Sequence, residues 1–400
     1  MKYVLILGDG MADFPIEELG GRTPLEAAST PFLDMLAEKS EQGLAKTVPD
    51  GMKPGSDTAN LSVMGYDPEK YYSGRSPLEA LSIGVPMEDD DIALRCNIVM
   101  LSEEENIPYE ARVIVDHSGG ELTQEEAAEL VNILKREFDS EEFQLWLGTS
   151  YRHCMIWKHG TVEELAAPHD HLDEICGPYL PKDPKFRSMM ERSFEILKDH
   201  PINVRRRAEG KNTANSMWFW GAGTKPMLSD FYEKTGKRGA MISAVDLLKG
   251  LAVGCGMKVC DVEGATGLLD SNFEGKVDAA VNALLEEGCD FAYIHLEAPD
   301  EMGHAGSVGK KIRAIEILDQ RVARPVYERL KAAGEDMKIL VLPDHPTPIA
   351  VRTHTGDPVP FLLYDSTDEK TGGLPYSEKN AGETGLYLEH GYELIDRLFG

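Results

Sequence analysis

The chain has 400 residues, which is enough for about two domains with sizeable cores. Its 42% hydrophobic and 28% charged residues are typical of a globular protein, and no run approaches the roughly 18 apolar residues that a membrane span needs. The formal net charge of −28 argues against nucleic acid and anionic membranes as partners, so an anionic substrate would require arginines and lysines gathered locally against this charge.

The N-terminal segment "MKYVLILGDGMAD" predicts a first core strand that ends just before Asp9. Lys2 ahead of apolar residues is a feature of signal peptides, but the apolar run is only about six residues long and leads directly into Gly-Asp-Gly. The six cysteines are scattered without a Cys-x-x-Cys pair, which predicts buried, reduced thiols in a cytoplasmic protein.

The stretch "PGSDTANL", residues 54–61, turns through Pro-Gly-Ser into a helical pattern. This places the Ser56 hydroxyl at a helix N-terminus, where backbone N–H groups and the helix dipole favour an anion. On its own, such a serine is typical of a simple N-cap. Beside metal ions, whose charge lowers the pKa of a hydroxyl group, Ser56 becomes a candidate nucleophile.

Residues 76–205 differ in character from the rest of the chain, with turn-rich acidic pieces and a loop rich in proline and histidine. We expect a smaller α+β domain here, inserted into a core formed by residues 1–75 and 206–400. The core repeats one pattern, in which a short apolar run precedes polar residues and a helical stretch, as in "YVLILGDG", "FAYIHLEAPD" and "KILVLPDHP". This alternation predicts an α/β fold with a mainly parallel sheet covered by helices on both faces.

Two further acids follow apolar runs in the C-terminal half: Asp300 after "FAYIHL" and Asp344 after "KILVL". The carboxyl ends of parallel strands share one edge of the sheet, where ligands bind, and neighbouring strands are about 4.8 Å apart. Asp9, Asp300 and Asp344 are therefore expected to converge. Carboxylates that close repel each other, and metal ions would remove this cost.

Histidines stand where further metal ligands would be needed. His304 follows Asp300 by four residues in what we interpret as a glycine-rich turn, "APDEMGHAG"; His345 is adjacent to Asp344, and His354 lies in "RTHTGDPVPF". Clusters of Asp and His offer oxygen and nitrogen without sulfur, which suits Mn²⁺ or Zn²⁺ better than Ca²⁺ or a structural zinc. His295, inside a predicted strand, is interpreted as a core histidine.

The motifs "LILGDG", "PGSDTANLSVMGYDP", "APDEMGHAG", "PDHPTP" and "THTGDPVPF" together resemble those of the alkaline phosphatase superfamily. Within it, the chain resembles the archaeal type of cofactor-independent (2,3-bisphosphoglycerate-independent) phosphoglycerate mutases over nearly its whole length. The resemblance implies an alkaline phosphatase-like core and two divalent ions, with Mn²⁺ expected ahead of Zn²⁺, Mg²⁺ or Co²⁺, and no nucleotide. It assigns Asp300, His304 and His354 to one ion, and Asp9, Ser56, Asp344 and His345 to the other.

The family chemistry implies that Ser56 takes the phosphoryl group from 3-phosphoglycerate and returns it to the 2-hydroxyl of glycerate, giving 2-phosphoglycerate. The insert would close over the metal edge and shield the phosphoserine from water. Arginines of the insert should bind the substrate's carboxylate and phosphate, because a planar guanidinium can hold two oxygens. The candidates are Arg75, Arg95 and Arg152, each of which is alternatively a surface or helix-end residue.

Asp116 and His117, in "VDHSGGEL", are candidates for proton transfer to the glycerate hydroxyls, or alternatively form an Asx-type turn. The insert departs from the family in "DHSGG" and "SYRHC", which makes the reaction class better supported than the substrate. A homoserine kinase-like phosphotransferase is therefore the main alternative, although the chain has no G-x-x-x-x-G-K-[ST] loop. A third reading is a metal-binding scaffold without enzyme activity, in which Ser56 is only a helix cap.

Overall fold

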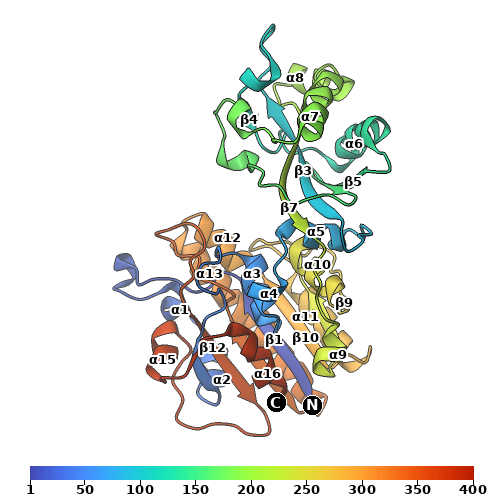
Figure 1. The fold of residues 1–400 in the computed structure, drawn as a ribbon. Helices are drawn as coiled ribbons and strands as arrows, with labels where there is room; N and C mark the ends of the chain where they lie inside the picture. The colour runs from blue at the N-terminus through green and yellow to red at the C-terminus, as the bar shows by residue number, and fades with distance from the viewer. The chain divides into compact units, whose positions relative to one another are not determined.

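The computed structural model describes all residues from Met1 to Gly400 and divides into two compact units (Figure 1). The core unit contains Met1–Tyr72 and Met227–Gly400, and the inserted unit contains Ser73–Pro226. The predicted end of the insert at residue 205 was wrong, because it falls inside helix α8 (Pro201–Ala208). Strand β7 (Ser216–Thr224) then pairs antiparallel with β3 (Ile92–Leu101) and keeps the chain in the inserted unit.

The core unit is built on an eight-stranded sheet in the order β13-β2-β12-β11-β1-β10-β8-β9. Its central strands are parallel, with β1 between β10 and β11, whereas β12 runs antiparallel to both β11 and β2. This confirms the predicted α/β fold with a mainly parallel sheet. The strands are β1 (Lys2–Gly8), β2 (Glu41–Ala45), β8 (Gly239–Ile242), β9 (Lys258–Val259), β10 (Phe291–Leu296), β11 (Met337–Leu342), β12 (Val359–Asp365) and β13 (Tyr387–Leu388).

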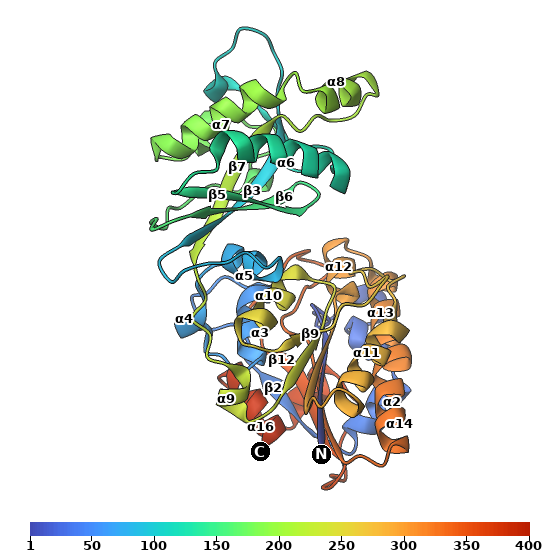
Figure 2. The same cartoon turned by 90° about the vertical axis from the view of Figure 1, so that its right-hand side faces the viewer.

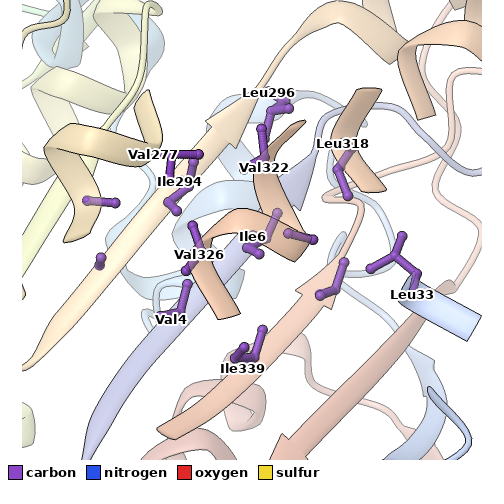
Figure 3. Packing of buried hydrophobic residues seen from close by; sticks show 14 of the residues in the cluster. Val4, Ile6, Leu33, Val277, Ile294, Leu296, Leu318, Val322, Val326 and Ile339 are labelled. Atoms are coloured by element: carbon purple, nitrogen blue, oxygen red, sulfur yellow. The ribbon is translucent and has the colours of Figure 1, made fainter. Parts of the chain in front are cut away.

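Helices cover both faces of this sheet (Figure 2). One face packs its aliphatic side chains, such as Val4, Ile6 and Ile294, against side chains of the covering helices, such as Val277 and Val326 (Figure 3). The elements on this face are α2 (Pro31–Ala37), α11 (Phe273–Leu285), α13 (Val308–Ile317), the π-helical segment η5 (Leu318–Ala323) and α14 (Arg324–Ala332).

The other face of the core sheet carries an aromatic cluster, in which Phe231 stacks on Phe291 with ring centroids 5.5 Å apart and Phe399 meets Phe291 edge-on at 5.3 Å. The helices on this face are α3 (Ser56–Val63), α9 (Phe231–Thr235), α10 (Asp246–Gly254) and α16 (Leu394–Phe399). The shorter helices are α1 (Pro24–Ala27), α4 (Pro68–Tyr71), α12 (Ala298–His304) and α15 (Glu378–Glu383). None of the helices combines the length and the apolar character that crossing a membrane requires.

The inserted unit is an α+β unit with a five-stranded sheet in the order β4-β3-β6-β5, to which β7 is added by pairing with β3. Its longest helices are α6 (Gln124–Phe138) and α7 (Pro184–Leu197). On β7, the buried Phe219 packs on Phe186 of α7 with ring centroids 5.1 Å apart, whereas the neighbouring, equally buried Trp218 donates from Nε1 to the carbonyl of Ala166 at 2.9 Å. The remaining elements are α5 (Arg75–Ser82), β4 (Ile114–Asp116), β5 (Phe143–Thr149) and β6 (Arg152–Trp157). All six cysteines of the chain are free, and all except the partly exposed Cys260 are buried.

Candidate active site

Three acidic side chains gather at the carboxyl edge of the core sheet because three neighbouring strands end there in register. Leu7 of β1 pairs with His295 of β10 and with Leu342 of β11, so the residues that follow leave the sheet at one level. Asp9 comes directly after β1, and Asp344 comes two residues after β11; they are 3% and 0% exposed. The predicted convergence of the strand ends is therefore present in the fold.

Asp300 and His304 lie on helix α12, and not in the turn that the sequence suggested. Pro299 is in the first turn of this helix, and no side chain caps its N-terminus. Helical geometry places residues four apart on the same face, which brings Asp300 Oδ2 within 3.2 Å of His304 Nε2. The spacing that looked like a turn motif is thus one turn of helix.

The first group of potential metal ligands consists of Asp300, His304 and His354. His354 Nε2 is 3.4 Å from Asp300 Oδ1 and only 3.1 Å from His304 Nε2. The Nδ1 atom of His304 lies 3.0 Å from the carbonyl oxygen of Arg352, to which it can donate its proton, leaving the Nε2 lone pair for a ligand. Arg352 has a left-handed backbone with φ of 58°, which is uncommon for an arginine and here directs its carbonyl toward His304.

The second group joins Asp9, Asp344 and His345 with Ser56. His345 Nε2 lies 3.6 Å from Asp9 Oδ1, 3.4 Å from Asp344 Oδ2 and 3.1 Å from Ser56 Oγ. Ligand atoms of Asp300 also lie within 4.8 Å of those of Asp9 and His345, so Asp300 stands between the two groups. The seven predicted metal ligands therefore lie in one connected cluster.

The charges of this site fit divalent cations. Burial, together with the neighbouring charges of Asp344 and Asp300, raises the pKa of Asp9 well above its ordinary value, and its Oδ1 atom is buried without a hydrogen-bond partner. Burial opposes the ionisation of Asp300, but hydrogen bonds with His304 and His354 hold its pKa well below the ordinary value. Buried acids with an unpartnered oxygen, facing imidazole nitrogens, are the donor set that a metal ion would complete.

Ser56 is not the cap of its helix. Gly55 holds the N-cap position of α3, and Ser56 is the first helical residue, with its hydroxyl directed toward His345. The simple N-cap interpretation of Ser56 is therefore wrong. Asn60, one turn later, donates from Nδ2 to the Ser56 carbonyl and to Asp344 Oδ2, both at 2.8 Å, and so ties the nucleophile candidate to a ligand candidate.

Three residues of this site were missed by the sequence analysis: Asn60, Tyr293 and Thr347. Tyr293 donates its hydroxyl to Asn60 Oδ1, while Thr347 donates to Asp300 Oδ1 and lies 3.3 Å from His345 Nδ1. All three are buried and orient the side chains that face the metal position. Two signals in the sequence could have pointed to these residues. Asn60 lies one helical turn after Ser56, and Thr347 comes two residues after His345.

The three predicted arginines lie near one another in the inserted unit. Glu79 Oε1 is 2.8 Å from Arg75 Nε, and Glu79 Oε2 is 2.9 Å from Arg95 Nε, so one acid orients two guanidiniums. Burial lowers the pKa of Arg95 to about 10, opposed by Glu79 and reinforced by the positive charges of Arg75 and Arg152. Three cations beside one acid leave a local excess of positive charge in a chain whose net charge is −28.

Asp116 and His117 differ in what their surroundings allow. The oxygens of Asp116 accept hydrogen bonds from Ser118, Gly120 and Asn212, and despite partial burial these contacts lower its pKa. These contacts favour the turn-stabilising alternative over proton transfer for Asp116. His117 instead has a buried Nδ1 atom without a hydrogen-bond partner, and its ring lies 5.8 Å from that of Tyr151.

Comparison with known proteins relates the chain to one family. Residues 37–203 match the family model described as 2,3-bisphosphoglycerate-independent phosphoglycerate mutase. A protein of that name from Methanosarcina acetivorans is 47% identical over 390 residues, covering 96% of each chain. These relatives give no support to the homoserine kinase alternative.

Solved structures agree with this relationship. A Pyrococcus horikoshii protein is similar with a TM-score of 0.81 and 32% identity, covering 100% of this chain and 97% of its own. The cofactor-independent phosphoglycerate mutase of Thermoplasma acidophilum is similar with a TM-score of 0.65 and 28% identity, covering 100% and 99%. On these similarities, the chain belongs to the family of 2,3-bisphosphoglycerate-independent phosphoglycerate mutases.

Proposed function

We propose that this protein interconverts 3-phosphoglycerate and 2-phosphoglycerate through a phosphoserine formed on Ser56, without 2,3-bisphosphoglycerate and without a nucleotide. The observation that carries the proposal is the Ser56 hydroxyl, 3.1 Å from His345 Nε2 within a cluster of buried carboxylates and imidazoles. Membership of the mutase family supports the substrate. The six unpaired cysteines support a reducing, cytoplasmic location.

The proposed metal content is two divalent ions, with Mn²⁺ ahead of Zn²⁺, Mg²⁺ or Co²⁺. Bound ions would lower the pKa of the Ser56 hydroxyl and neutralise the phosphoryl oxygens. The first ion would be held by Asp300, His304 and His354, and the second by Asp9, Ser56, Asp344 and His345.

The protein's own groups account for the remaining chemistry. Ser56, in its deprotonated form, makes a bond from Oγ to phosphorus as the bond to the 3-oxygen of glycerate breaks, and that oxygen takes up a proton from His117. In the second half the 2-hydroxyl of glycerate gives up its proton, bonds to phosphorus and releases Ser56. His117, with its unpartnered Nδ1, is the proposed carrier of that proton, and the arginines at positions 75, 95 and 152 hold the carboxylate and phosphate.

The test uses the Mn²⁺-loaded protein and ³²P-labelled 3-phosphoglycerate, with no bisphosphoglycerate and no ATP. Acid quenching and peptide mapping should place the label on the peptide that contains Ser56. Ser56→Ala should lose both the label and the formation of 2-phosphoglycerate. Ser62→Ala is the matched control, because Ser62 is a buried serine of the same helix that makes no contact with His345. Absence of labelled protein, with phosphohomoserine formed from ATP and homoserine, would contradict the proposal.

A further inference from the structure

His295, which the sequence suggested was a core histidine, connects the metal site to a buried serine. It lies on β10 and is fully buried, with Nε2 2.9 Å from Asp9 Oδ2 and Nδ1 3.1 Å from Ser243 Oγ. Ser243, directly after β8, is also buried, and its hydroxyl oxygen accepts the N–H of Val245 at 3.0 Å. Three chain segments therefore meet in one line of hydrogen bonds that ends at Asp9.

The direction of these hydrogen bonds follows from counting donors and acceptors. His295 Nδ1 is the acceptor within reach of the Ser243 hydroxyl, which therefore donates its proton there. An imidazole carries at least one N–H, which must then be on Nε2 of His295 and is donated to Asp9 Oδ2. The Ser243 oxygen still accepts from Val245, and every group in the line has a partner.

This line of hydrogen bonds gives the two carboxylate oxygens of Asp9 different surroundings. Oδ2 is occupied by His295, while Oδ1 is buried without a hydrogen-bond partner and lies 3.6 Å from His345 Nε2. Lys276, only 1% exposed, donates from Nζ to the His295 carbonyl at 2.8 Å and fixes the backbone from which the imidazole projects. Asp9 is thus held in one orientation, with its free oxygen directed at His345.

We propose that His295 and Ser243 are positioning residues that present Asp9 Oδ1 to the second metal ion. The proposal rests on the metal site of the proposed function and goes beyond it, because neither residue is among the expected ligands. Ser243 acts only through His295, since its hydroxyl reaches the site by that imidazole alone. A merely packed histidine would contribute to folding but would leave metal affinity unchanged.

The test measures Mn²⁺ binding to the metal-free full chain by calorimetry, with thermal unfolding of the metal-free protein alongside. His295→Phe keeps a ring of similar size but removes the donor, and should weaken binding at the second ion 10- to 100-fold, as other partners of metal ligands do. His295→Gln replaces Nε2 by an amide N–H and should bind within about threefold of wild type. Ser243→Ala should weaken binding in the same direction, and the double variant His295→Phe/Ser243→Ala should be no weaker than His295→Phe alone.

Each result bears on one claim. Wild-type affinity in both His295→Phe and Ser243→Ala, with only the unfolding temperature lowered, would overturn the positioning role and leave the proposed function standing. Should His295→Phe not fold, Ser243→Ala decides by the same criterion. A wild-type chain that binds no Mn²⁺ would instead refute the metal site itself, and with it this inference.

Discussion

A methyl group at Gly10 should displace the metal ligands, since the backbone of this residue is pressed against α12. Gly10 has φ of +60° and donates its N–H to Asp344 Oδ1 at 3.2 Å. An added Cβ would lie 2.5 Å from Asp300 Oδ1 and 2.8 Å from Asp300 Cα, with Thr347 Oγ1 closer still. Because Asp300 Cα belongs to a helix backbone, it cannot rotate away, and the loop or the helix must shift by more than half an ångström.

The expected cost of Gly10→Ala has two parts. A left-handed backbone costs a residue with a Cβ roughly 1–2 kcal/mol, and forced overpacking adds roughly 1–3 kcal/mol. Gly20→Ala is the matched control: Gly20 has φ of +69° and no atom within 4 Å of its added Cβ, so only the first part applies. A displacement near 1 Å in Gly10→Ala should also lower turnover about 100-fold, while Gly20→Ala should keep full activity.

Denaturant unfolding of the metal-free proteins, Mn²⁺ calorimetry and the mutase assay together separate these effects. Gly10→Ala should be less stable than Gly20→Ala, bind Mn²⁺ more weakly and turn over more slowly. If both variants bind metal and turn over alike, the close packing of Gly10 against Asp300 does not matter for the site, and the reasoning is wrong.

Two further predictions concern the inserted unit and the pH dependence of stability. Arg152→Ala should raise the ratio of inorganic phosphate to 2-phosphoglycerate, because glycerate held less tightly escapes and leaves phosphoserine to water; an unchanged ratio with unchanged KM would make Arg152 a surface residue. Burial raises the pKa of Asp319 to about 6, so its folded form retains a proton that the unfolded chain loses near pH 3.8. Its contribution to the free energy of unfolding should fall by roughly 2 kcal/mol as the pH rises from about 4 to about 6. The difference between wild type and Asp319→Asn in urea unfolding at these pH values should show that slope; parallel curves would contradict it.

The gathering of the candidate metal ligands was largely predictable because it depends on a regular feature of parallel sheets. Short buried runs ended at or near Asp9, Asp300 and Asp344, and parallel strands in register bring such ends together without detailed knowledge of packing. Helix α12 was not predicted, because its seven residues include proline and glycine and have no capping side chain. The local sequence of "APDEMGHAG" is therefore equally compatible with a turn.

Other features depend on contacts between distant parts of the chain. The pairing of β7 with β3 joins residues more than 100 positions apart, and the local sequence "SMWFWGAGT" does not indicate which strand it pairs with. The role of His295 was missed for the same reason, because a buried histidine on a strand is equally consistent with packing until Asp9 and Ser243 are seen beside it. The sequence suggested that Ser56 is the N-cap of its helix, whereas Gly55 is the N-cap and Ser56 is the first helical residue.

Because the carboxylates of the site lie close together, metal binding should stabilise the folded state, and we expect this effect in the core unit only. Burial, together with repulsion from Asp344 and Asp300, raises the pKa of Asp9. The metal-free site therefore destabilises the folded state. A cation that binds only the folded chain stabilises it by about 2.7 kcal/mol at 100 times its Kd. All seven expected ligands belong to the core unit, and none lies in Ser73–Pro226.

Hydrogen exchange can locate this stabilisation. Backbone amides of β1, β10 and β11 should exchange up to about 100-fold more slowly when Mn²⁺ is added at that concentration, because their opening requires the ion to leave. Amides of β3 and β6 in the inserted unit should change little. His345→Ala, which removes one expected ligand, should lose most of the slowing in the core strands. Equal slowing in both units, or full slowing in His345→Ala, would mean that Mn²⁺ acts elsewhere than at the edge of the core sheet.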